Sequence, residues 1–250
     1  MQDCIYTAAE SVERSGLKGL PLFKACQDSF FQKMAKRALT QKHSKGKILF
    51  LHGDEARYFY FIQKGLVRLF RETLDGSQVT VDILPAGQVL ALRTIFEDDL
   101  YPYSAEIVEN AEITSYPLSY LKDEIQTNNT LALNMLSSMS RCKRRKEQEI
   151  EHREIQNAPQ RIGCFLLRLI PQNKEGPVTI HLPYDKTLVA ARLGMQPETF
   201  SRALSKLKRE TGIKIKGATI ELDTVQQLVQ FSCAACSSEF PCKDLQQREF

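Results

Sequence analysis

The sequence has no long apolar run, no basic segment leading into an apolar core at its N-terminus, and only four histidines. A transmembrane helix needs about 20 apolar residues in succession, so the first absence argues against a membrane protein. The N-terminus M-Q-D-C-I-Y does not resemble a secretory signal, and we therefore expect a soluble, cytoplasmic chain. The histidines form no H-x-H pair, which argues against a cupin-like metalloenzyme; we expect no enzymatic activity.

What is present is the composition of a globular protein with one large or two ordinary domains. The 250 residues are 42% hydrophobic and 26% charged, which is enough for a sizeable core. The net charge is only +4, but residues 159–232 hold eleven basic and six acidic side chains. Such an excess suits contact with DNA phosphates, although a solvated basic surface would give the same count.

Residues 45–118 have the pattern of a series of short strands. Apolar runs rich in Val, Ile, Phe and Tyr alternate with glycine or charged turns, and Asp75-Gly76 between two runs is a hairpin signal. Strands at this spacing predict an antiparallel barrel or jelly roll. Before them, short helices are expected around Leu20–Cys26 and Phe30–Leu39.

A long helix is predicted after the strands, because no glycine or proline occurs within Ile125–Ile155. One apolar face recurs at helical spacing and consists of Leu131, Met135, Met139 and Cys142. A helix of about 30 residues with one narrow apolar face is typical of a dimer coiled coil. Packing against another helix of the same chain is the alternative.

The next segment predicts two helices joined by a tight turn. Asp185 suits the cap of a helix over Lys186–Leu193, and Gly194 supplies the turn residue. Pro197 fits the first turn of a second helix that runs to about residue 210. This is the order of a helix–turn–helix motif.

The flanking segments complete a winged helix. Pro159 opens a helix whose apolar positions include Cys164, which we expect in the core. Ile213–Leu222 alternates around Gly217 and predicts a two-stranded wing, and a last helix is expected over Thr224–Phe231.

Four motifs follow one another in the chain: F-x-x-G-D at Phe50–Asp54, F-x-F-I-x-x-G-x-V-x-L at Phe59–Leu69, P-x-G at Pro85–Gly87, and the helix–turn–helix at Asp185–Leu207. Together with the long helix they resemble the CRP/FNR regulators over roughly residues 20–231. The resemblance implies an α+β fold with an N-terminal antiparallel β jelly-roll or barrel of the cyclic-nucleotide-binding type, a long dimerisation helix and a C-terminal winged helix–turn–helix. It also implies a homodimer that binds double-stranded DNA and works with RNA polymerase.

We expect four segments on this basis. They are a sensory barrel over residues 1–124, a dimerisation helix over 125–156, a DNA-binding domain over 157–232, and a cysteine-containing tail over 233–250.

Carried over by position, the resemblance assigns base reading to Glu198, Ser201 and Arg202, with Thr199 beside them. Their chemistry agrees, because glutamate accepts from a cytosine amino group, arginine donates to guanine, and a serine hydroxyl serves base or phosphate. The E-x-x-S-R spacing resembles the FNR branch and implies a palindrome of TTGAT-type half-sites. A solvated helix start is the alternative.

Two positions in the barrel argue against cAMP as the effector. Ala91-Leu92 stands where CRP-like members have a Gly-Glu pair for the ribose, and Tyr103 precedes Ser104 where an arginine holds the phosphate. Neither leucine nor tyrosine can replace those contacts. Arg93 lies nearby and is the one candidate to replace the missing phosphate-binding arginine.

The N-terminal cysteine site of FNR-type oxygen sensors is incomplete in this chain. Only Cys4 and Cys26 lie in the first 120 residues, and Thr114 stands at the position of the barrel cysteine. The C-terminal end is richer, with the C-x2-C-x5-C run of Cys233, Cys236 and Cys242. Cysteines at such short spacing bind iron–sulfur clusters or zinc.

A branch of FNR-like regulators is similar, with a fourth ligand from the long helix; the candidates here are Cys142, Glu147 and Glu151. The resemblance therefore implies a response to oxygen, nitric oxide or redox state. Zinc, direct thiol oxidation and an unliganded tail stay open. In the last case a small molecule or haem would bind elsewhere, the haem through one of His43, His52, His152 and His181. A cyclic-nucleotide-type signalling module that does not bind DNA is the other alternative.

Overall fold

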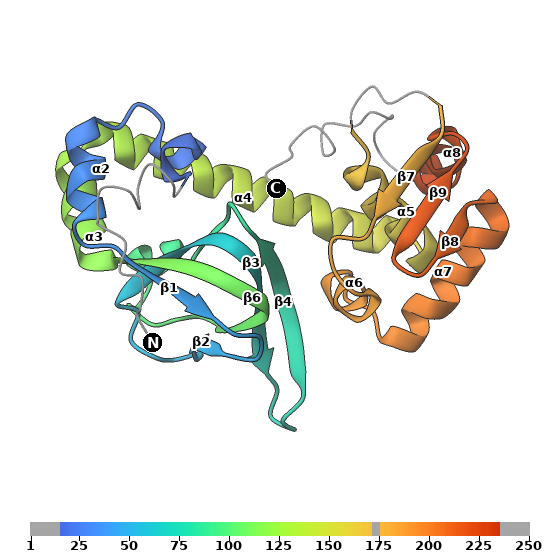
Figure 1. Cartoon of the computed structure of the whole chain (residues 1–250), viewed down its shortest axis with the longest axis horizontal. Helices are drawn as coiled ribbons and strands as arrows, with labels where there is room; N and C mark the ends of the chain where they lie inside the picture. The colour runs from blue at the N-terminus through green and yellow to red at the C-terminus, as the bar shows by residue number, and fades with distance from the viewer. Residues whose placement is uncertain (1–15, 172–175, 236–250) are drawn as a thin grey trace. The chain divides into compact units, whose positions relative to one another are not determined.

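The computed structural model describes residues 16–171 and 176–235, which divide into two compact units between Cys142 and Lys143 (Figure 1). Each unit has an apolar core of its own. In the described part of the chain, no helix combines the length and apolar character needed to cross a membrane.

The first unit is built on an antiparallel six-stranded sheet, as the strand pattern predicts. The strand order is β1-β6-β3-β4, while β2 pairs with β6 and β5 with β3. The two long strands β3 and β6 pair along most of their length and hold the sheet together. The bounds are β1 (Leu39–His43), β2 (Ile48–Phe50), β3 (Tyr58–Glu72), β4 (Gln78–Pro85), β5 (Val89–Leu90) and β6 (Ser104–Pro117).

The expected hairpin between β3 and β4 is confirmed. Gly76 has φ +80°, the left-handed backbone that glycine adopts without steric cost. The amide of Thr73 donates to the carbonyl of Ser77 at 2.8 Å, which closes the loop. The carboxylate of Asp75 accepts from the Ser77 amide, and bonds from Thr73 and Ser77 lower its pKa to about 2.

Short helical segments cover one end of this sheet, and their bounds differ from the expected ones. The first expected helix consists of two 3-10 turns, η1 (Leu17–Gly19) and η2 (Pro21–Phe23). The second, α2 (Asp28–Ala35), ends early because residues from Leu39 onward pair with β6 as strand β1.

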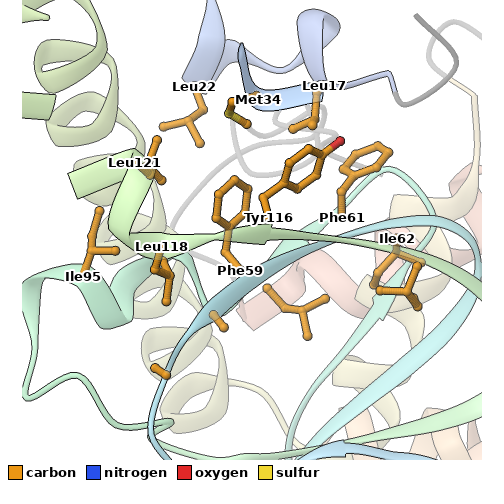
Figure 2. Packing of buried hydrophobic residues seen from close by; sticks show 14 of the residues in the cluster. Leu17, Leu22, Met34, Phe59, Phe61, Ile62, Ile95, Tyr116, Leu118 and Leu121 are labelled. Carbon is orange, nitrogen blue, oxygen red and sulfur yellow. The ribbon is translucent and has the colours of Figure 1, made fainter. Parts of the chain in front are cut away.

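The first core lies between these helical turns and the sheet. Figure 2 shows Leu17, Leu22 and Met34 above the aromatic side chains of Phe59 and Tyr116, which come from β3 and β6. All five are buried, from 0% to 5% exposed. The rings of Phe59 and Tyr116 stack at 5.1 Å. The segment before the strands is therefore an integral part of this unit.

The predicted long helix is interrupted at Asn128. Helix α3 (Leu118–Thr127) ends where the Asn128 amide donates to the Glu124 carbonyl at 2.8 Å. The Asn128 side chain then accepts from the Leu131 amide at 3.1 Å and starts α4 (Asn129–Ile155). Asparagine is a strong N-cap residue, so a helix can restart there without glycine or proline.

The predicted apolar face of α4 is divided between two roles. Leu131 and Met135 are 0% and 2% exposed and belong to the core of the first unit. This half of the face therefore packs within the chain, and the expectation of a dimer seam through it is wrong. The other half of the face is more open, since Met139 is 37% exposed. Outside the predicted face, α4 also exposes Leu133 and Leu136, each at 63%.

The second unit is a winged helix with one strand more than predicted. Strand β7 (Val178–His181) pairs with β9 (Thr219–Leu222), which also pairs with β8 (Lys214–Lys216). Around this sheet lie α5 (Ala158–Leu169), α6 (Lys186–Arg192), α7 (Pro197–Thr211) and α8 (Gln226–Ser232), followed by the 3-10 turn η4 (Cys233–Ala235). Cys164 is buried, as expected.

Candidate nucleic-acid interface

Helix α6 begins at the predicted cap and ends at the predicted glycine. The Asp185 carboxylate accepts from the Leu188 amide at 2.9 Å. At the other end, the amides of Gly194 and Met195 donate to the carbonyls of Ala191 and Ala190 at 3.0 and 2.9 Å. This is the Schellman arrangement, and Gly194 has the positive φ (+63°) that it requires.

This turn fixes the start of helix α7. Met195 is 7% exposed and anchors the chain in the core just after the turn. Pro197 then occupies the first turn of α7, and Gly212 ends the helix with φ +73°. The buried Met195 after the turn and Gly212 at the far end therefore define where α7 begins and ends.

Helix α7 separates a buried apolar face from an exposed polar one. The buried face consists of Phe200, Ala203, Leu204 and Leu207. Glu198, Ser201 and Arg202 are exposed near the N-terminal end, while Thr199 is half-buried. Positions i, i+3 and i+4 lie on one side of a helix, so the three exposed side chains form one surface.

No hydrogen bond or ion pair engages the Glu198, Ser201 or Arg202 side chain within residues 16–171 and 176–235. Their donors and acceptors are directed to solvent, in the combination that reads base edges. The structure thus brings these three predicted residues together on one face and leaves Thr199 at its margin.

The predicted wing is present as the hairpin β8–β9, with Gly217 at φ +60° between the strands. Lys214 and Lys216 are exposed on β8. They form long ion pairs with Asp223 (3.7 Å) and Glu221 (3.3 Å). Exposed pairs of this kind contribute little to stability, so both lysines are available to phosphates.

Comparisons with known proteins match both units. The family model described as "Cyclic nucleotide-binding domain" matches residues 40–128, and that described as "Crp-like helix-turn-helix domain" matches residues 160–231. The first match covers most of the first unit and the second match covers most of the second unit. The residues outside both matches are mainly those of α4 and of the two termini of the chain. The chain belongs to the CRP/FNR family of transcription regulators.

The chain is similar to curated regulators and to solved structures of this family. The cyclic AMP receptor protein of Thermus thermophilus is 26% identical over 82% of this chain and 94% of its own length. The fumarate and nitrate reduction regulatory protein of Vibrio cholerae is 25% identical, over 75% and 76%. A solved structure from Ruegeria pomeroyi, titled a putative cyclic nucleotide binding protein, is 26% identical with a TM-score of 0.62, over 90% and 98%. As a CRP/FNR member, the chain is a DNA-binding transcription regulator.

The barrel has left-handed backbone at the predicted ribose position, where Ala91 and Leu92 stand in place of Gly and Glu. Ala91 has φ +62°, in the left-handed region that favours the glycine of CRP-like members. Leu92 follows it, at the start of the 3-10 turn η3 (Leu92–Phe96). Arg93 donates to the Tyr103 hydroxyl at 3.5 Å, and the Ser104 hydroxyl accepts from the His52 amide at 3.0 Å.

Two positions of the FNR-type N-terminal cysteine site are described, namely Thr114 and Cys26. Thr114 is fully buried, and its hydroxyl oxygen accepts from the Gln63 amide at 2.6 Å and bonds to the Thr40 hydroxyl at 2.9 Å. Burial, with the nearby Glu124 carboxylate, raises the pKa of the Cys26 thiol. A raised pKa disfavours the thiolate that binds metals.

The C-terminal candidates lie at the edge of the described part. Cys233 is half-buried in η4 and packs against the second core, while Cys236 and Cys242 lie outside the described residues. Of the helix candidates, Cys142 is half-buried and Glu147 pairs with Lys143 at 3.2 Å. Among residues 16–171 and 176–235, no three His, Cys, Asp or Glu side chains converge as metal ligands, so a site with Glu147 or Glu151 stays a sequence prediction.

A contact that the sequence does not reveal links α4 to the helix–turn–helix. Arg192 at the end of α6 donates to the Glu149 carboxylate at 2.8 Å, and Lys146 donates to it at 3.0 Å. Burial alone would raise the pKa of Glu149, but the two cations outweigh it and hold the pKa at about 2. The partners are 43 residues apart, and Glu149 lies in a run of charges that resembles a solvated face.

Proposed function

We propose that the protein is a homodimeric, sequence-specific regulator that binds an FNR-like palindrome of TTGAT-type half-sites. The observation that carries this proposal is the exposed face of α7, where Glu198, Ser201 and Arg202 project without intramolecular partners among the described residues. An acceptor, a hydroxyl and a bidentate donor on one face of a helix suit the donor and acceptor pattern of the major groove.

A second copy fits the exposed apolar surface of α4. Leu133, Leu136 and Met139 follow one another at steps of three, which places them on one side of the helix. Exposed leucines at such spacing are typical of a helix that pairs with its symmetry mate. Dimerisation would present two recognition helices to the two halves of a palindrome, as the family's mode of action requires.

For the signal, we propose oxygen, nitric oxide or redox state, sensed by Cys233, Cys236 and Cys242 with a fourth ligand among Cys142, Glu147 and Glu151. Support comes from their C-x2-C-x5-C spacing and from the unsuitability of the alternative sites. Thr114 is occupied by hydrogen bonds and the Cys26 thiol is disfavoured as a thiolate. An iron–sulfur cluster would supply the chemistry that reacts with oxygen; zinc would supply none of that redox chemistry.

Cyclic AMP is a weaker candidate effector for this chain. The Leu92 side chain cannot accept a hydrogen bond from a ribose hydroxyl, and Tyr103 cannot neutralise a phosphate. The remaining cation, Arg93, is exposed and bonds weakly to Tyr103. If a small effector binds in the barrel instead, it must therefore be a ligand that does not need the ribose and phosphate contacts of cyclic AMP.

Two measurements test these proposals separately. A gel shift with two TTGAT half-sites, at fixed salt, tests the DNA-binding proposal under oxic, anoxic and reducing conditions. No shift in any of them, with a scrambled duplex as control, would contradict the proposed operator. Iron, sulfide and zinc content with a visible spectrum, on protein purified without air, tests the sensor. A colourless protein without metal, bound equally to DNA in air and without it, would end the cysteine hypothesis.

A further inference from the structure

The last turn of α4 lies against the turn of the helix–turn–helix. An ideal Cβ placed on Gly194 would lie 3.7 Å from Nη2 of Arg153, so this guanidinium rests on the turn itself. Gln196, two residues later, is the residue from which α7 starts. A side chain of the long helix thus reaches the entrance of the recognition helix, within the second unit.

A second guanidinium, that of Arg161, interacts electrostatically with the first. Arg161, in the first turns of α5, has its Nε atom buried without a hydrogen-bond acceptor among the described residues. Burial, and then the positive charge of Arg153, lower the pKa of Arg161. The two like charges are therefore near enough to repel each other, and one of them carries an enclosed donor that lacks a partner in the described part of the chain.

No carboxylate offsets these charges among residues 16–171 and 176–235. Arg153 forms no ion pair there, and Glu149, one turn earlier on α4, pairs with Arg192 and Lys146. An unpaired buried donor is costly, and so is a pair of like charges without a counter-charge. An anion beside the turn would offset the two positive charges and would be bound through the exposed Arg153 guanidinium, since the Nε of Arg161 is itself buried.

We propose that Arg153 and Arg161 form a binding site for one backbone phosphate of the operator. The inference rests on the proposed DNA binding, since α7 brings a duplex to the same turn. Arginine is suited to the ligand, because its planar fork binds phosphate oxygens through two N–H groups. The long helix then takes part directly in DNA binding, although it lies before the residues that the helix–turn–helix family model matches.

An arginine that binds a phosphate contributes to the salt dependence of DNA binding, whereas an arginine with only a structural role does not. Removing one neutralised phosphate reduces the slope of log K against log salt concentration by about 0.9, on specific and unrelated DNA alike. The R153Q variant removes the charge but keeps an amide donor and an exposed side chain, so the fold should be unaffected. We expect its slope to be smaller by about 0.9 per subunit on the operator, with the same relative decrease in affinity on a scrambled duplex.

The matched control is K143A, which removes one positive charge from an exposed position of the same helix, 79% exposed and paired with Glu147. Its slope should equal that of the unmodified protein. An unchanged slope in R153Q, with the unmodified protein binding DNA normally, would overturn the phosphate site alone. An equal decrease in K143A would also overturn it, because net charge would then explain the effect. Absence of DNA binding by the unmodified protein would instead defeat the proposed function.

Discussion

At the scale of single residues, Arg202 is the side chain on which base discrimination should depend most. It is exposed, unpaired within the described residues, and one turn from Glu198 on the same face of α7. We expect the R202A variant to lose about 1–3 kcal/mol of discrimination at one base pair of each half-site, because a bidentate contact to guanine is removed. Competition gel shifts with single-base operator variants measure this effect.

The control for that experiment lies on the same helix. Arg209 is exposed near the C-terminal end of α7 and pairs with Glu210 at 3.1 Å. The R209A variant should keep the base preference of the unmodified protein. If R202A weakens all duplexes by the same factor, Arg202 binds the DNA backbone rather than a base.

Glu149 is a residue whose effect should depend on pH. Its folded-state pKa of about 2 lies below the ordinary carboxyl value, so its stabilising effect is complete above about pH 5 and is lost as pH falls towards 2. The E149Q variant should lower the free energy of unfolding by about 1–3 kcal/mol at pH 7. Urea unfolding at pH 7 and pH 3 checks this, since the difference between the two proteins should shrink at the lower pH.

At the scale of elements, the packing of α5 on α8 depends on Gly163. A Cβ at this position would lie 1.9 Å from the Ser232 hydroxyl oxygen and 3.1 Å from its Cβ. The G163A variant should therefore unfold at lower urea concentration, with its stability reduced by about 1–3 kcal/mol, because the two helices must move apart.

Ser232 supplies the control. Its hydroxyl is buried without a hydrogen-bond partner in the described residues, so S232A alone should be neutral or slightly stabilising. The double variant G163A/S232A should recover part of the lost stability, since the closest overlap is with that oxygen. Equal stability of G163A and the unmodified protein would show that α8 adjusts freely.

The elements predicted best from the sequence are those with local signals. Asp185, Gly194 and Gly217 each determine a cap or turn through their own chemistry, and the helix–turn–helix and wing lie where these residues indicate. Strand β7 was missed because it is four residues long and is stabilised by pairing with β9, about 40 residues later. The break at Asn128 was missed because the sequence around it contains no glycine or proline.

The same distinction applies to the candidate site. Glu198, Ser201 and Arg202 follow from helical spacing, which acts within one turn. The Glu149–Arg192 pair and the approach of Arg153 to Gly194 join residues about 40 positions apart, and no local pattern reports them. The division of the α4 face has the same origin, because burial of Leu131 and Met135 depends on the barrel core rather than on the helix.

At the scale of the whole molecule, the dimer is what connects recognition to a palindrome. We expect the L136D variant to remain folded, because Leu136 is 63% exposed, and to dimerise much more weakly. Each leucine buried at a dimer interface contributes about 1.5–3 kcal/mol, and the substitution removes one from each subunit. Sedimentation at several protein concentrations measures the shift. Operator affinity should fall with it, since one half-site alone binds a single recognition helix.

The neighbouring S137D variant places the same charge at an exposed position of α4, one turn after Leu133 and so at the edge of the proposed surface, and should weaken the dimer less than L136D. Equal weakening in both variants would indicate a general effect of charge on α4. A dimer of L136D as stable as that of the unmodified protein would move the interface to another surface. In that case the exposed apolar side chains of α4 would need a different partner. Another surface would then have to form the dimer that places two recognition helices on the palindrome.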